Sequence, residues 1–91
     1  MSGASQAEAL ELSRRMLEAA RGGAWEEVAA LDERRRELLA GAALPPATWE
    51  ALLALHEEVL ALAERARQEA LEGLEGLRRG QAARKAYGGC P

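Results

Sequence analysis

Apolar residues recur every three or four positions along most of the chain, and polar residues fill the intervening positions. In the first such segment the small and apolar residues cover one half of a helical wheel: Ala9, Leu10, Leu12, Ser13, Met16, Leu17, Ala19 and Ala20. A period of 3.6 residues predicts an amphipathic helix. Ser5, followed three residues later by Glu8, predicts a capping box at its start.

A double glycine separates this helix from a second one. Gly22 is expected to end the first helix in a left-handed conformation, and Gly23 to cap the second. So short a turn predicts an antiparallel hairpin. The second helix is expected over residues 24–40, with Gly41 as its stop and this apolar face: Trp25, Val28, Leu31, Leu38 and Leu39.

A proline-containing loop precedes the third and longest helix. Thr48 predicts a start near Trp49, and Pro46 in the first helical turn is the alternative. The helix is expected over residues 49–79, and its apolar positions, which continue to Leu77, cover about half of the circumference. At about 1.5 Å per residue this helix is near 45 Å long, whereas the first two are each about 25 Å. Its second half should therefore extend beyond the hairpin.

These elements predict an all-α fold, an antiparallel three-helix bundle made of a helical hairpin and one long helix. Residues 1–79 form the domain, and residues 80–91 form a short C-terminal tail or partial fourth helix that starts at Gly80. Trp25 should plug the closed end of the hairpin, level with Ala63 and Ala66 of the antiparallel third helix. The tail should fold back weakly onto the following exposed leucines: Leu71, Leu74 and Leu77.

Composition supports this fold and narrows the function. The chain has 91 residues, is rich in Leu and Ala, and lacks Phe, which favours helix over strand. A net charge of −3 and 3% aromatic residues do not suit a nucleic-acid-binding protein. We expect no membrane span and no signal peptide, and the single Cys90 fits a reducing compartment. The sequence predicts a cytoplasmic protein.

No residue pattern predicts catalysis, a cofactor or a metal site. The only histidine, His56, lies on the apolar arc of the third helix and has no second His or Cys at ligand spacing. We interpret it as a core or boundary residue. The stretch "LDERRRELL" is superficially similar to the second helix of all-helical chorismate mutases, but the other basic residues do not converge on one pocket.

One polar pair interrupts the apolar face of the second helix. Asp32 and Arg35 are three residues apart and can form an ion pair, with Arg35 extending outward to water. The alternative is that this face stays uncovered and binds a partner helix. In that case the partner would bind the apolar face of the second helix, the third helix and the tail. The candidate partner-binding residues are Leu31, Arg35, Leu38, Val59, Leu62, Ala66, Leu74 and Tyr87.

The chain resembles the FliT-type flagellar export chaperones. The resemblance rests on "LSRRMLEAARGGAW", on "RRREL", on the proline-containing loop before a long leucine-rich helix, and on the terminal "AYG". It implies a small helical chaperone of the cytoplasm. Such a chaperone binds the C-terminal segment of the filament-cap protein, prevents premature assembly, and passes it to the export ATPase complex.

In enteric relatives a C-terminal helix also masks the binding face, and the protein restrains a flagellar transcription activator. Tyr87 lies where that helix carries its "AY" pair. The chain departs from the family at Ala24, where relatives often have an acidic residue, and in its short, glycine-flanked tail. The resemblance leaves open a monomer or a homodimer. The competing interpretation is a self-associating helical structural or adaptor protein, against which Gly73 and Gly76 argue.

Overall fold

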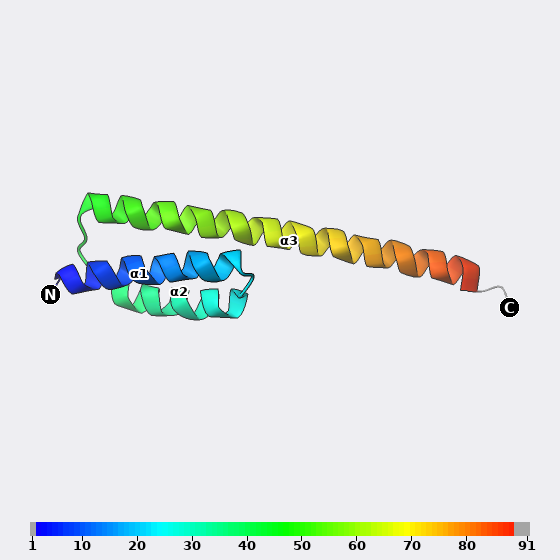
Figure 1. Cartoon of the computed structure of the whole chain (residues 1–91), viewed down its shortest axis with the longest axis horizontal. Helices are drawn as coiled ribbons and strands as arrows, with labels where there is room; N and C mark the ends of the chain where they lie inside the picture. The colour runs from blue at the N-terminus through cyan, green and yellow to red at the C-terminus, as the bar shows by residue number, and fades with distance from the viewer. Residues whose placement is uncertain (1, 89–91) are drawn as a thin grey trace.

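A computed structural model describes the backbone of residues 2–88 and the side chains of residues 5–84. This part of the chain consists of three helices, α1 (Ser2–Arg21), α2 (Trp25–Leu39) and α3 (Pro46–Gly88), and contains no strand. α2 runs antiparallel to both α1 and α3 (Figure 1). The predicted all-α fold, with a hairpin followed by one long helix, is confirmed.

α1 is the central helix of the bundle. It packs against both α2 and α3, whereas no Cα atom of α2 comes within 8 Å of one in α3 among the described residues. The second and third helices of the bundle therefore do not pack directly on each other. The physical reason lies in α1, where the fully buried Ala9 and Ser13 are small enough to let two helices approach. The core contains these buried residues: Leu12, Met16, Leu17, Ala19, Ala20, Val28, Leu31 and Val59.

Two helices start earlier than the main predictions placed them. α1 begins at Ser2, so Ser5 and Glu8 lie inside the helix rather than at its cap. α3 begins at Pro46, the alternative that the sequence allowed. Proline is tolerated in a first turn because the amide proton that it lacks would have no helical partner there.

The hairpin turn depends on a left-handed glycine, but at Gly23 rather than at Gly22. Gly23 has a φ of 74°, and its carbonyl accepts a hydrogen bond from the amide of Trp25 at 3.0 Å. The other positive φ among the described residues is 73° at Gly41, which follows α2 as predicted. Both glycines supply a conformation that other residues adopt only with strain.

Exchanging each glycine of the turn for alanine should separate their roles. Gly23→Ala is expected to lower the free energy of unfolding by about 1 kcal/mol, because a Cβ atom strains the left-handed conformation. Gly22→Ala is the matched control. Its Cβ would meet nothing nearer than the Ala19 carbonyl oxygen at 3.7 Å, and it should be neutral or slightly stabilising. Urea denaturation of both variants measures the difference, and a reversed order would contradict this assignment.

Trp25 contacts the core, as predicted, but it packs mainly on α1 and not opposite α3. Its side chain is half-buried and packs against the core cluster, which α1 dominates. Because α2 and α3 pack on α1 and not on each other, the indole does not fill a space opposite Ala63 and Ala66 in a directly packed helix pair. Trp25 anchors the start of α2 on α1.

α3 does not end at Gly80. It continues to Gly88, and its C-terminal half extends away from the hairpin, so that the molecule is 73 Å long (Figure 1). We call residues 67–88 the overhang. The predicted fold-back of the tail is absent from the described residues, while Cys90 lies outside them. Propagating an existing helix through one glycine costs only about 1 kcal/mol, less than nucleating a new short helix.

Candidate binding groove between α2 and α3

A groove of about 460 Å³ runs between the C-terminal half of α2 and the first turns of α3. On the α2 side it is lined by Asp32, Arg35, Arg36 and Leu39, and by Ala40 directly after the helix. From α3 it is lined by Trp49, Leu52, Leu53 and His56. One side of the groove is thus largely apolar and the other carries most of its charges.

The groove occupies the position that a fourth helix would take in a four-helix bundle. α1 contacts both neighbours while α2 and α3 do not contact each other, so these two lie on a diagonal. Arg35 of α2 nevertheless reaches His56 of α3, with 3.1 Å between Nη2 and Nδ1, so the two helices face each other across the groove. Helices pack side by side at 8–10 Å. A fourth helix placed in this groove would therefore contact α2 and α3 at once.

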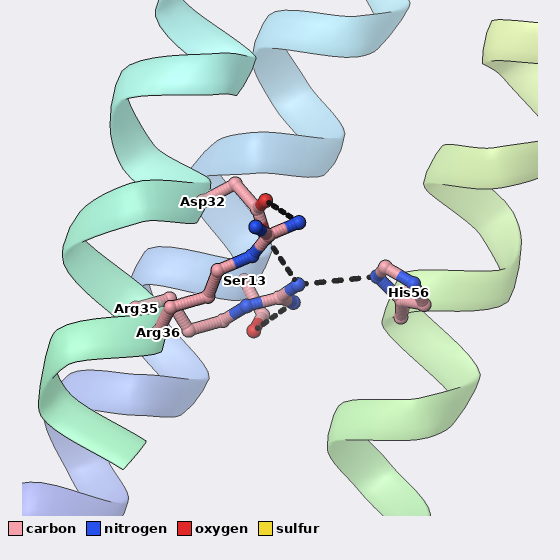
Figure 2. Close-up of polar contacts among 5 residues, drawn as sticks. All are labelled: Ser13, Asp32, Arg35, Arg36 and His56. Carbon is pink, nitrogen blue, oxygen red and sulfur yellow. Dashed lines mark hydrogen bonds and ion pairs between the residues drawn. The ribbon is translucent and has the colours of Figure 1, made fainter. Parts of the chain in front are cut away.

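Arg35 forms the polar base of the groove (Figure 2). Its side chain reaches across from α2 toward the other two helices and is only 9% exposed. Nη1 donates a hydrogen bond to Ser13 Oγ of α1 at 3.1 Å, and Nη2 lies 2.8 Å from Asp32 Oδ1. The predicted Asp32–Arg35 ion pair is confirmed, but the predicted outward extension of Arg35 is wrong. Partners on α1 and α3 hold the guanidinium inside.

His56 completes the bridge from the α3 side. Nη2 of Arg35 lies 3.1 Å from His56 Nδ1, and Figure 2 shows the imidazole pointing across the groove toward Arg35. A guanidinium group has donors only, so Nδ1 must accept and the imidazole proton must be on Nε2. As expected, His56 is a half-buried boundary residue with a satisfied ring nitrogen. This contact joins α2 to α3 without direct packing of the helices.

The groove carries an excess of positive charge. Asp32 uses its second carboxylate oxygen, Oδ2, to pair with Arg36 at 3.0 Å, so one carboxylate faces two guanidinium groups. The Arg36 side chain is 79% exposed and stands at the rim. An incoming helix would thus meet an apolar wall on α3 and an accessible cation on α2.

The structure places the candidate partner-binding residues in different settings. Arg35 lines the groove, whereas Leu31 and Val59 are buried in the core, and Leu38, Leu62 and Ala66 are half-buried. Leu74 is exposed on the overhang, away from the groove. The side chain of Tyr87 lies outside the described residues.

Sequence reasoning missed the apolar wall of the groove. Trp49 is 44% exposed and Leu53 is 56% exposed, and both line the groove. An available signal was that Trp49 and Leu53 share one face of α3 with Leu60, at separations of four and seven residues. Periodicity identifies such a face, but it does not distinguish a covered face from an open one.

The described part of the chain shows neither a metal site nor a membrane-spanning helix. No group of three or more potential metal-ligating side chains occurs among those residues. The helices that the structure describes also include none with the length and apolarity to span a membrane.

The fold and the groove define an all-helical module with one vacant helix position. Residues 5–89 match a family model described as "Flagellar protein FliT", and the chain therefore belongs to the FliT family. This is a family of flagellar proteins and not a family of enzymes. Comparison with curated proteins and with solved structures found no match.

Proposed function

We propose that this chain is a cytoplasmic flagellar export chaperone that binds the C-terminal segment of the filament-cap protein. By occupying that segment it would prevent premature assembly and aid delivery to the export apparatus, with the export ATPase complex as a second partner. Membership of the FliT family supports a flagellar role. The open groove between α2 and α3 is the observation that carries the binding proposal.

The groove favours an amphipathic helix as its ligand. Trp49 and Leu53 are exposed in the groove and offer apolar surface to one face of such a helix. Arg36 at the rim favours an acidic side chain beside the apolar face of the ligand. Leu31 and Val59 are buried in the core and do not line the groove. Arg35 and His56 hold its two walls together.

Titration calorimetry of the full chain with a peptide of the cap protein's C-terminal segment tests the proposal. We expect saturable binding that Leu53→Glu weakens by at least about tenfold, equivalent to about 1.4 kcal/mol, because a carboxylate would enter the apolar wall. Leu53 is already half exposed, so this variant should keep the fold.

Ala54→Glu is the matched control. Ala54 is exposed and follows Leu53 directly, but successive residues on a helix point about 100° apart. The control adds the same charge outside the groove and should bind the peptide like the unmodified chain. Absence of binding by the unmodified chain, or equal weakening by both variants, would contradict the proposal.

A further inference from the structure

The large apolar residues that are exposed on α3 all lie on one face. At 100° per residue they fall within an arc of about 120°. They are Trp49, Leu53, Leu60, Leu71, Leu74 and Leu77. We call this face the apolar stripe. From Trp49 to Leu77 it extends over about 42 Å, because a helix rises about 1.5 Å per residue.

The apolar stripe begins in the groove and ends on the overhang. Trp49 and Leu53 form the groove wall opposite α2, whereas Leu71, Leu74 and Leu77 are 46%, 46% and 64% exposed on the overhang. Figure 1 shows both parts on one continuous helix, α3. A ligand helix that packs along the groove wall and continues in the same direction would therefore meet the leucines of the overhang next.

The charged residues of the overhang lie on different sides of α3. Arg67 and Arg78 lie within about 40° of Leu74 around the helix axis. The three glutamates lie about 100° to 160° away from it: Glu69, Glu72 and Glu75. Among the described side chains Arg78 forms no ion pair, and the Arg67 side chain remains 66% exposed. The overhang part of the apolar stripe is therefore accompanied by positive charge.

The groove shows the same combination of apolar and positively charged groups. There the exposed Trp49 and Leu53 lie across from Arg36, whose side chain is 79% exposed. A ligand that is complementary to such a surface has an apolar face bordered by carboxylates. Because both parts of the apolar stripe favour the same ligand chemistry, a single helix can satisfy both.

We propose that the ligand of the groove is one acidic amphipathic helix that continues onto the overhang. To cover the apolar stripe from Trp49 to Leu77 it needs about 28 helical residues. Its carboxylates would pair with Arg36 at one end, and with Arg67 and Arg78 at the other. This inference rests on the proposed function and extends its binding site, so that the overhang is the second half of that site.

Titration calorimetry of the full chain tests the second half of the site. The probe is a peptide of about 30 residues from the cap protein's C-terminal segment, long enough to span the apolar stripe. Leu74→Glu should weaken its binding by at least about tenfold, because a carboxylate would enter the apolar contact and face the acidic ligand. Ala83→Glu is the matched control. Ala83 is exposed on the overhang about 180° from Leu74, so this variant should bind like the unmodified chain.

Two neighbouring arginines test the charge contact. Arg78→Glu and Arg79→Glu change the net charge equally, and both side chains are exposed and form no ion pair among the described side chains. Arg79 lies about 140° from Leu74, outside the apolar stripe. Arg78→Glu should therefore weaken peptide binding by at least about threefold more than Arg79→Glu does. Circular dichroism of all four variants verifies that they stay helical.

The outcomes separate this inference from the proposed function. If Leu53→Glu weakens peptide binding and Leu74→Glu does not, the ligand occupies the groove alone, and only this inference is overturned. Equal effects at Arg78 and Arg79 would also overturn it. Absence of binding by the unmodified chain would contradict both proposals. Sedimentation equilibrium of the free chains provides a last check, because a lower mass for Leu74→Glu would assign the overhang part of the stripe to a second copy and overturn the inference.

Discussion

Replacing Arg35 with methionine is expected to lower the free energy of unfolding by about 2–3 kcal/mol. Methionine retains most of the aliphatic part of the arginine side chain. The loss of stability should therefore come mainly from the polar groups that no longer receive a hydrogen bond from the guanidinium. Ser13 is fully buried, and its hydroxyl would lose the guanidinium contact. An unsatisfied buried polar group costs about 1–3 kcal/mol. Asp32 limits the loss because it keeps its contact with Arg36.

Two variants serve as controls for Arg35→Met. Arg34→Met makes the same chemical change at the preceding residue, whose side chain is 66% exposed, and should alter stability by less than about 0.5 kcal/mol. Adding Ser13→Ala to Arg35→Met should recover part of the loss, because removing both polar partners costs less than removing one. Urea denaturation at neutral pH measures all three variants. Equal effects at Arg34 and Arg35 would contradict the buried network.

The two tryptophans should give opposite results when each is replaced with alanine. Trp25→Ala is expected to cost about 2–3 kcal/mol of stability, below the 3–5 kcal/mol of a fully buried tryptophan, because Trp25 is half-buried against the core. Trp49→Ala should cost less than about 1 kcal/mol, since that side chain is 44% exposed. It should instead weaken binding of the cap-protein peptide, because Trp49 lines the groove.

Thermal unfolding and peptide titration of both variants separate the two roles. Each variant is the control for the other, since the side chain removed is identical. A larger loss of stability in Trp49→Ala would mean that the groove wall is part of the core. Unchanged peptide binding in Trp49→Ala, with the fold intact, would place the binding site elsewhere.

Local signals predicted the elements of the fold. The 3.6-residue period identified three helices, and the loop around Pro45 and Pro46 separated the second from the third. Gly41 was correctly expected to end α2, because few other residues tolerate its φ of 73°. The family resemblance, which rested on motifs in all three helices, is confirmed over residues 5–89. Such patterns involve residues that are close in the sequence, so they can be recognised without knowledge of the tertiary structure.

The arrangement of the helices relative to one another could not be predicted from such local patterns. An apolar arc shows that a helix has a buried face, but it does not specify the neighbour that covers it. The sequence pattern was compatible with direct packing of α2 on α3, whereas in the structure each packs on α1 instead. The same ambiguity affected Arg35, whose position on an apolar face was predicted but whose partners Ser13 and His56 were not.

The sequence by itself determined that this is an all-helical member of the FliT family with an apolar face on each helix. Only the tertiary structure decided which parts of those faces remain open, namely the groove beside Trp49 and Leu53 and the overhang beside Leu74. The reason is that helix formation depends on local propensity and period, whereas exposure depends on contacts among residues distant in the chain. A groove is a vacant position among three helices, and no single segment of the sequence encodes it.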